Sequence, residues 1–316
     1  MDNILVIGAS GQIGSELTVA LRDRYGNDNV FATDIKDAPA DVMESGPFHL
    51  LDVMNNKEVS EFIDKHKIDQ IYLLAAMLSG TAEKHPMRAW DVNMDSLMSV
   101  LELCRDKGIR KLFWPSSIAV FGPSTPKENT PQVTITEPNT VYGISKLAGE
   151  RWTEYYNTKY GIDVRGIRYP GLISYKTEPG GGTTDYAVEI FYEAVKKGNY
   201  ECFLSKDTTL PMMFMADAIR ATLDLMEADG EQLTIRGGYN VAGFSFSPEE
   251  IASEIKKHIP GFEISYNPDF RQKIADSWPQ SIDDSTARTD WGWNHEYGLE
   301  KMTEIMLEEV KRKLGI

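Results

Sequence analysis

The sequence predicts an α/β fold in which a doubly wound parallel sheet occupies the first part of the chain and a smaller mixed lobe follows it. Apolar segments of strand length alternate with amphipathic helical segments through the first half. These apolar segments are continuous rather than alternating in polarity, which is typical of parallel strands covered on both faces. The alternation of strands and helices is lost after about Leu172, and this change predicts the lobe.

The elements of the first half follow one another in strict order. The first strand ends at a glycine, and the first helix ends at Gly26. The expected strands are residues 3–9, 29–35, 70–76, 110–117 and 163–171. The expected helices are residues 15–26, 59–67, 91–108 and 142–161.

The second half is less regular. Residues 179–182, Pro-Gly-Gly-Gly, indicate a loop. The expected helices are residues 185–198, 216–228 and 247–259, and the expected strands are residues 209–215 and 237–243. We therefore place a domain boundary near residue 172. Residues 1–172 form the sheet domain, and residues 173–316 form mainly the lobe, with some segments returning to the sheet domain.

Composition excludes several classes of function. The 316 residues carry a net charge of -15, and an acidic surface of this kind repels nucleic acid and anionic membranes. The two cysteines, Cys104 and Cys202, form no Cys-x-x-Cys motif, so we expect neither a metal site nor a disulfide framework. The chain enters a strand at once and has no apolar run of membrane length, so we expect a cytoplasmic protein. A precursor whose leader is missing would give the same sequence.

The segment GASGQIG lies between the first strand and the first helix. Its glycines allow the backbone to turn tightly and to approach a pyrophosphate, whose charge the N–H groups of the helix stabilise. A plain glycine-rich turn is the alternative interpretation. The position directly after an N-terminal strand favours dinucleotide binding. The residues of this turn that we expect at the cofactor are Gly8, Ser10, Gly11, Gln12, Ile13 and Gly14.

Asp34 ends the second strand, about 20 residues beyond Gly14, where a carboxylate can accept hydrogen bonds from both ribose hydroxyls. This carboxylate would repel a 2′-phosphate, and although Lys36 follows it, no arginine does so closely. We therefore expect NAD rather than NADP, which makes residues 1–172 a Rossmann domain. Asp52 and Val53, after the apolar residues 47–51, are expected to flank the adenine, or Asp52 caps a helix instead.

Tyr142 and Lys146 lie one turn apart on one face of a predicted helix. A nearby positive charge lowers the pKa of a phenol and makes it a usable base. An aromatic ring that packs on a lysine stem is the alternative. Ser116 and Ser117 fall at the carboxyl end of the fourth strand, where open α/β sheets bind ligands, or they form only a solvated turn.

Taken together, the glycine turn, the strand-end serine and Tyr-x-x-x-Lys resemble the short-chain dehydrogenase/reductase superfamily. The resemblance is to its extended branch, which contains sugar-nucleotide epimerases and dehydratases, and it covers nearly the whole chain. It implies that Tyr142 is the acid/base, that Lys146 lowers its pKa and holds the nicotinamide ribose, and that Ser117 binds the reacting oxygen. Asn93 matches a helix asparagine of the family or is simply structural. Further implied cofactor contacts are Leu74, Ala75, Ala76, Tyr169 and Leu172.

Epimerases of this branch carry arginines for the diphosphate of a nucleotide sugar. The equivalent strand here reads LPMMFM (residues 210–215) and no Arg-Pro-Gly occurs, so a nucleotide sugar fits poorly. The stretches PGGGTTDYA and ADSWPQSIDD instead resemble the L-threonine 3-dehydrogenases of this superfamily. That resemblance implies oxidation of the 3-hydroxyl of L-threonine by NAD to 2-amino-3-ketobutyrate.

A small zwitterionic substrate requires few polar groups. The expected substrate contacts are Ser79, Ser117, Tyr142, Thr183, Thr184 and Trp278. The glycines at 180–182 are interpreted as a loop that closes over substrate, or as a surface connection. For Ser79 the alternative is a loop serine, and for Trp278 it is core or interface packing.

The helices that carry residues 90–104 and 142–156 keep apolar residues beyond those facing the sheet. The family resemblance therefore implies a homodimer through a four-helix bundle, whereas a single broad buried stripe per helix is the alternative. Two other functions stay open. One is a sugar-nucleotide epimerase or dehydratase, and the other is an NAD-binding sensor without chemistry.

Overall fold

The structure, a computed structural model, describes residues 2–178 and 180–316. The chain divides into two compact units, each made of several segments. The first unit contains Met1–Ser117, Val141–Arg168 and Ile219–Tyr239, and the second contains Ile118–Thr140, Tyr169–Ala218 and Asn240–Ile316. The division of roles at residue 172 stays a prediction. Pro179, part of the expected glycine loop, lies outside the described residues.

The first unit is built on a six-stranded sheet in which all neighbouring strands are parallel. The strand order is β3-β2-β1-β4-β5-β7, so the chain winds outward from β1 in both directions, and the predicted doubly wound sheet is confirmed. Every residue of β1 is buried, as a continuous apolar run predicts. The strands are β1 (Ile4–Ile7), β2 (Val30–Asp34), β3 (Phe48–Leu50), β4 (Gln70–Leu73), β5 (Lys111–Phe113) and β7 (Asp163–Arg165).

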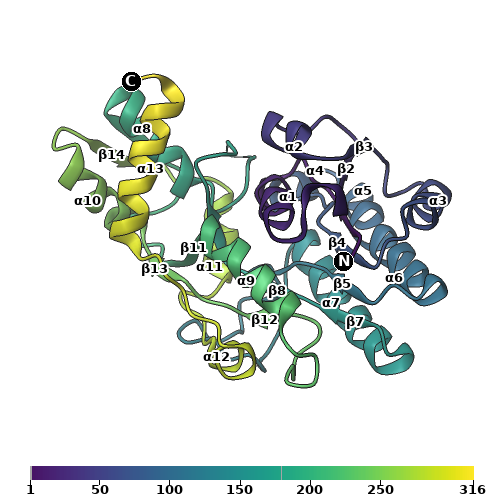
Figure 1. Ribbon diagram of the computed structural model, residues 1–316. Coiled ribbons are helices and arrows are strands. Elements are labelled where there is room, and N and C mark those ends of the chain that lie inside the picture. Colours follow the sequence, from purple (N-terminus) through teal and green to yellow (C-terminus); the bar gives the residue numbers. More distant parts are fainter. Residues whose placement is uncertain (1, 179) are drawn as a thin grey trace. The chain divides into compact units, whose positions relative to one another are not determined.

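Helices cover both faces of this sheet. Three of them pack on one face, where Leu5, Leu97 and Val164 belong to a continuous apolar core, and α1 packs on the other face (Figure 1). The three helices of the core face are α3 (Asn56–His66), α6 (Ser96–Lys107) and α7 (Val141–Tyr160). The other helices of this region are α1 (Gln12–Tyr25), η1 (Asn27–Asn29), α2 (Ala40–Ser45), α4 (Ser79–Lys84) and α5 (Pro86–Trp90).

Two segments that were predicted as single strands are interrupted. Residues 110–117 divide into β5 and β6 (Ser116–Ser117), because Pro115 has no backbone N–H to continue the ladder. Residues 163–171 divide into β7, β8 (Ile167–Tyr169) and the start of β9 (Gly171–Ile173). β8 lies between β6 and β12 (Tyr239–Asn240) in a separate short sheet, so Ser117 is carried by a strand outside the main sheet.

The predicted helix 91–108 is not α-helical throughout. It begins with a π-helical turn, η2 (Asp91–Asp95), and continues as α6. A π turn inserts an extra residue into a helical ladder and is often found near functional sites. Here it carries Asn93, whose side chain is buried.

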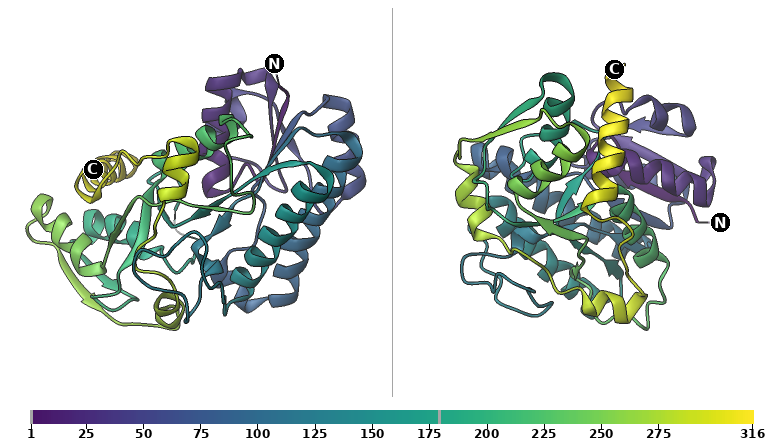
Figure 2. Two further views of the ribbon diagram at one scale, coloured as in Figure 1. Left: turned by 90° about the horizontal axis from the view of Figure 1, so that it is seen from below. Right: turned by 90° about the vertical axis from the view of Figure 1, so that its left-hand side faces the viewer.

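The second unit contains two small sheets. β11 (Leu210–Phe214) pairs in parallel with β9 and antiparallel with β13 (Phe244–Phe246), and β10 (Asn199–Cys202) pairs in parallel with β14 (Glu263–Tyr266). α8 (Tyr186–Lys197), α10 (Pro248–His258) and α13 (Leu299–Leu314) pack on one another, with α13 shown in yellow in Figure 2. The other helices are η3 (Ile118–Val120), α11 (Arg271–Ser277) and α12 (Ser285–Trp291), while α9 (Met215–Glu227) runs from this unit into the first.

Two features are absent from the described residues. In residues 2–178 and 180–316, no helix has both the length and the apolar character that a bilayer span requires. The same residues contain no group of three or more His, Cys, Asp or Glu side chains arranged to hold a metal ion.

Candidate active site

The glycine turn after β1 is packed too closely to accept larger residues at two positions. Gly8 has a φ of +95°, and a Cβ built there would lie 2.6 Å from the backbone nitrogen of Ala75. A Cβ at Gly14 would overlap the carbonyl oxygen of Gly8. The first glycine therefore makes the turn possible, and Gly14 lets α1 approach it closely, which are two of the roles that glycines have in a dinucleotide-binding turn.

Asp34, at the carboxyl end of β2, is joined to this turn by hydrogen bonds. Its Oδ2 accepts from the backbone N–H of Ser10 at 2.9 Å, and its Oδ1 accepts from the N–H of Ile35 at 2.7 Å. The Ser10 hydroxyl donates to the carbonyl of Lys36 at 3.1 Å. These bonds hold the carboxylate of Asp34 beside the glycine turn, which is the relative position that the sequence predicted.

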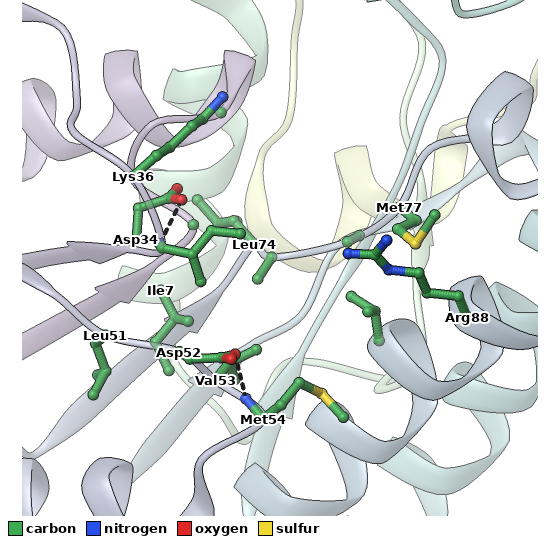
Figure 3. Close-up of a pocket in the computed structure, with 16 residues that line it drawn as sticks. Ile7, Asp34, Lys36, Leu51, Asp52, Val53, Met54, Leu74, Met77 and Arg88 are labelled. Atoms are coloured by element: carbon green, nitrogen blue, oxygen red, sulfur yellow. Dashed lines mark hydrogen bonds between the residues drawn. The ribbon is translucent and has the colours of Figure 1, made fainter. Parts of the chain in front are cut away.

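A pocket of about 460 Å³ opens at the carboxyl ends of β1, β2 and β4, within the first unit (Figure 3). A pocket of this size is in the range of small-molecule and cofactor sites. The expected cofactor residues that line it are Gly8, Gly11, Asp34, Asp52, Val53, Leu74, Ala75 and Ala76. The expected residues Ser10, Gln12, Ile13 and Gly14 belong to the turn and to the start of α1 and are not among its lining residues.

The sequence allowed two interpretations of Asp52, as a residue beside the adenine or as the cap of a helix. The structure does not support Asp52 as the cap of α3. The Oδ1 atom of Asp52 accepts from the N–H of Met54 at 2.9 Å, which closes a short turn beside the pocket. Asn55 caps α3 instead, because its side chain accepts from the N–H of Glu58. Asp52 and Val53 therefore line the pocket wall, as the other interpretation requires.

The sequence interpretation missed one cationic lining residue, Arg88. It projects from α5 toward the pocket from the side opposite Asp34 and Lys36 (Figure 3). Within residues 2–178 and 180–316, the Arg88 guanidinium has no hydrogen-bond or ion-pair partner. No motif could have indicated Arg88, because it belongs to no pattern and only the path of α5 brings it to the pocket.

Ser117, Tyr142 and Lys146 come together in the first unit, although β6 and α7 are separated by a long stretch of chain. The Tyr142 side chain is half-buried, and its hydroxyl is hydrogen-bonded to the Ser117 side chain. The Lys146 Nζ donates to the carbonyl of Pro115 at 2.6 Å and lies 4.3 Å from the centroid of the Trp114 ring. The same Nζ lies 5.5 Å from the centroid of the Tyr142 ring.

The pKa values of this set are governed mainly by burial. Burial raises the pKa of Tyr142 to about 12, and the hydrogen bond with Ser117 opposes this shift. Burial lowers the pKa of Lys146 to about 7, and the carboxylate of Glu150 opposes it. In the protein alone the pKa of Tyr142 therefore lies above its usual value, because desolvation of the phenol outweighs its neighbours. The expected lowering of this pKa by Lys146 stays a prediction.

Asn93 has a structural role that the sequence left open. Its side chain accepts from the N–H of Met77 at 2.8 Å and donates to the carbonyl of the same residue at 3.2 Å. It also donates to the Ser145 hydroxyl at 3.2 Å, and that hydroxyl donates to the carbonyl of Tyr142 at 2.7 Å. Asn93 thus ties the segment after β4, which lines the pocket, to the first turn of α7.

Ser79 is buried at the start of α4. This helix packs against α7, and the Oε1 of Glu83 in α4 accepts from the N–H of Val141 at 2.8 Å. A carboxylate at a helix N-terminus is favourable, because it complements the helix dipole and an otherwise unpaired N–H. The segment that carries Ser79 is therefore attached to the residue before Tyr142.

The remaining expected residues belong to the second unit. Tyr169 and Thr183 are buried, Leu172 is half-buried in β9, and the Thr184 side chain packs close to Gly171. Trp278 is buried beside a pocket of about 360 Å³, and its carbonyl accepts from Lys127. In the glycine loop, the N–H groups of Gly181 and Gly182 both donate to the Asp185 carboxylate at 2.7 Å. Their expected roles stay predictions.

A nicotinamide dinucleotide fits the residues of the first unit. The turn that contains Gly8 and Gly14 has no room for larger side chains at these two positions, and Asp34 presents carboxylate oxygens beside it. Arg88 and Lys36 add positive charge at the pocket. A ligand with two phosphates and a ribose diol requires this combination of groups.

Comparison with known proteins agrees with this geometry. Residues 4–242 match the NAD dependent epimerase/dehydratase family. An uncharacterized epimerase/dehydratase of Staphylococcus haemolyticus is 52% identical over 315 residues, which are 99% of each chain. The holo form of an L-threonine dehydrogenase from Cupriavidus necator is 55% identical with a TM-score of 0.95, covering 98% of this chain and 100% of that one. A monomeric L-threonine 3-dehydrogenase from a metagenome is 49% identical with a TM-score of 0.94, covering 98% and 99%.

A doubly wound parallel sheet with a glycine-rich first turn defines a Rossmann-type α/β protein. The chain belongs to the NAD-dependent epimerase/dehydratase family, in the extended branch of the short-chain dehydrogenase/reductase superfamily. The resemblance that the motifs indicated is thereby confirmed.

Proposed function

We propose that this protein is an NAD-dependent L-threonine 3-dehydrogenase, which oxidises the 3-hydroxyl of L-threonine to give 2-amino-3-ketobutyrate. The observation that carries the proposal is the near full-length similarity to L-threonine dehydrogenases, at 55% and 49% identity. The curated relative at 52% identity has no assigned substrate, so the substrate assignment rests on those structures and on the sequence stretches near Thr183 and Trp278.

In this proposal the proton and the hydride leave the substrate by different routes. Tyr142, as the phenolate, accepts the proton of the 3-hydroxyl, and Ser117 donates a hydrogen bond to the same oxygen, because these two side chains already share a hydrogen bond. Since burial raises the pKa of Tyr142 in the protein alone, this step requires the positive charges of Lys146 and of bound NAD⁺ to favour the phenolate. The acceptor for the hydride of carbon 3 would be supplied by bound NAD⁺. The loss of one proton and one hydride from the alcohol balances the formation of the ketone.

Two further residues of the first unit support cofactor binding. Asp34 accepts hydrogen bonds from the hydroxyls of the adenosine ribose, and its negative charge disfavours a 2′-phosphate there. Lys146 contacts the nicotinamide ribose through its buried ammonium. Positioning of this kind supplies much of the rate enhancement, since it replaces a chance encounter with a fixed geometry. The substrate contacts are proposed at Ser79, Thr183, Thr184 and Trp278.

We further propose that the protein is a cytoplasmic homodimer that associates through α6 and α7, which lie side by side (Figures 1 and 2). α7 leaves Ile144, Trp152 and Tyr155 between 41% and 47% exposed, and a second copy of the chain could cover this apolar surface. Sedimentation velocity of the wild type and of Trp152→Glu tests the dimer. A wild type that sediments as a monomer, like the metagenome relative named monomeric, would contradict it.

The experiment that tests the function is a substrate panel followed by NADH absorbance. L-threonine, D-threonine, L-serine and UDP-galactose are offered with NAD⁺ and, in parallel, with NADP⁺. We expect turnover with L-threonine and NAD⁺. Conversion of UDP-galactose in place of L-threonine, followed by chromatography of the sugar nucleotides because an epimerase returns its hydride and releases no net NADH, would favour an epimerase. NAD binding without any turnover would favour a sensor. Either result removes the proposal.

A further inference from the structure

Beneath the Ser117–Tyr142–Lys146 set lies a charged residue whose side chain has no access to solvent. Glu150 follows Lys146 by one helical turn on α7, on the face that also carries Tyr142. It is 0% exposed, although a carboxylate is rarely buried unless it is paired.

Glu150 is paired on both of its oxygens. Arg168 donates from Nε to Oε1 and from Nη2 to Oε2, each at 2.8 Å, which is a bidentate ion pair. The Ser116 hydroxyl donates to Oε1 at 2.5 Å. The backbone at Gly238 closes the site, because a Cβ built there would lie 2.8 Å from the same oxygen. The carboxylate is therefore held in one position by three separate segments.

Glu150 is connected to the proposed reactive residues in two ways, through its bond with Ser116 and through its charge near Lys146. Ser116 immediately precedes Ser117 on β6, so a bond from Ser116 to α7 fixes how Ser117 meets Tyr142. Lys146 is buried with few polar neighbours, and Glu150 is the carboxylate that favours its charged form. The other charged or titratable groups near this pair are Arg168 on β8 and Tyr142 on α7.

We propose that Glu150 is a positioning residue for the Ser117–Tyr142–Lys146 set. It joins β6 to α7 through Ser116, and it places a buried negative charge one helical turn from the Lys146 ammonium. This inference rests on the proposed alcohol oxidation, because it assigns Glu150 an effect on that chemistry rather than on substrate or cofactor contact.

Three variants separate the effect of Glu150 on the position of Ser117 from the effect of its charge on Lys146. Ser116→Ala removes only the hydroxyl bond and leaves the charge of Glu150. Glu150→Gln removes the charge and keeps the size of the side chain. Glu154→Gln is the matched control, since Glu154 lies one turn further along α7, is exposed and forms an ion pair with the exposed Arg151.

For each variant we would measure kcat with L-threonine against pH, the dissociation constant for NADH by fluorescence, and Tm. We expect Ser116→Ala to lower kcat on the order of tenfold with an unchanged pH profile. Glu150→Gln should lower kcat on the order of tenfold to a hundredfold. It should also move the alkaline limb of the profile to lower pH, because the Lys146 ammonium loses its neighbouring negative charge. Glu154→Gln should match the wild type in all three readouts.

Some outcomes would overturn the inference. A Glu150→Gln protein with wild-type kcat and pH profile removes it, and so does a loss of kcat that parallels only the folded fraction. If Glu150→Gln does not fold, Ser116→Ala and the double variant Glu150→Gln/Arg168→Met, which removes both charges of the pair, replace it. Failure of the proposed function itself is distinguished by the wild type. If the wild type does not oxidise L-threonine with NAD⁺, the proposed function fails, whereas an active wild type with an equally active Glu150→Gln removes only the role of Glu150.

Discussion

The Lys146 ammonium lies 5.5 Å from the centre of the Tyr142 ring and donates its hydrogen bond to the carbonyl of Pro115. The phenol hydroxyl is hydrogen-bonded to Ser117 instead. The two residues are thus neighbours on one face of α7, but the Lys146 ammonium and the Tyr142 hydroxyl have different hydrogen-bond partners. Any effect of Lys146 on the ionisation of Tyr142 therefore acts through space rather than through a shared hydrogen bond.

Tyr142→Phe removes the proposed proton acceptor and little else. We expect kcat with L-threonine to fall about 10²–10⁴-fold, which is the usual contribution of a positioned acid or base. The dissociation constant for NAD⁺, measured by quenching of tryptophan fluorescence, should stay close to that of the wild type. Near-normal turnover of this variant would exclude Tyr142 as the base.

The ionisation of Tyr142 can be followed directly. Burial raises the pKa of Tyr142 to about 12, so the neutral phenol persists to high pH in the cofactor-free protein. In the difference between the absorbance titrations of the wild type and of Tyr142→Phe at 295 nm, we expect no phenolate signal below pH 10. A signal that develops at neutral pH without cofactor would show that burial does not govern this group.

Asp34→Ser tests the choice between the two nicotinamide cofactors. The substitution removes the charge that would repel a 2′-phosphate and leaves the cation of Lys36 nearby. We expect the ratio of kcat/KM for NADP⁺ to that for NAD⁺ to rise on the order of a hundredfold, since like charges in contact cost several kcal/mol. Asp37→Asn, an exposed carboxylate of the same loop, is the control and should leave the ratio unchanged. An unchanged ratio in Asp34→Ser would argue against the role of Asp34.

Arg88→Gln tests the cation on α5. An exposed guanidinium beside a phosphate contributes modestly, so we expect the dissociation constant for NADH to rise about two- to fivefold at low salt. The difference from the wild type should shrink as salt is added, because screening weakens exposed pairs. Lys84→Gln removes an exposed cation from the neighbouring α4 and should change neither quantity. Equal affinity of Arg88→Gln and wild type at low salt would contradict the contact.

His49 and His66 lie at the β3 edge of the sheet, and we expect their protonation in acid to lower the stability of the fold. The His66 ring lies 4.3 Å from Phe62, 4.5 Å from Phe31 and 5.6 Å from His49, measured between ring centroids. Desolvation lowers the pKa of both histidines, and the charge of Lys65 adds to the shift. Their contribution to stability is therefore present above the unfolded-state pKa, about 6.5, and is lost as the pH falls through the lower folded-state pKa.

We expect the free energy of unfolding in urea to decrease from pH 7 to pH 5, and to decrease less in His66→Phe, which keeps an aromatic ring but cannot be protonated. His258→Gln, an exposed histidine at the end of α10, should have the slope of the wild type. If His66→Phe has that slope too, the acid sensitivity has another origin.

Much of the fold could be predicted because its signals are local. The apolar runs of β1, β2 and β4 and the glycine stops of their helices are continuous in sequence, and they predicted the sheet correctly. The interruption at Pro115 could also have been seen, since proline cannot donate to a strand ladder. The π turn at Asn93 could not, because its extra residue is stabilised by contacts with Met77 and Ser145.

The sequence by itself determined the glycine turn, Asp34 and the Tyr142–Lys146 pair, because each depends on a spacing along one or two adjoining elements. Only the tertiary structure decided that Arg88 reaches the pocket, that burial raises the pKa of Tyr142, and that Glu150 meets Ser116 and Arg168, which lie 34 and 18 residues away. The physical reason is that burial and charge pairing depend on how distant segments pack together, and a spacing pattern contains no information about that packing.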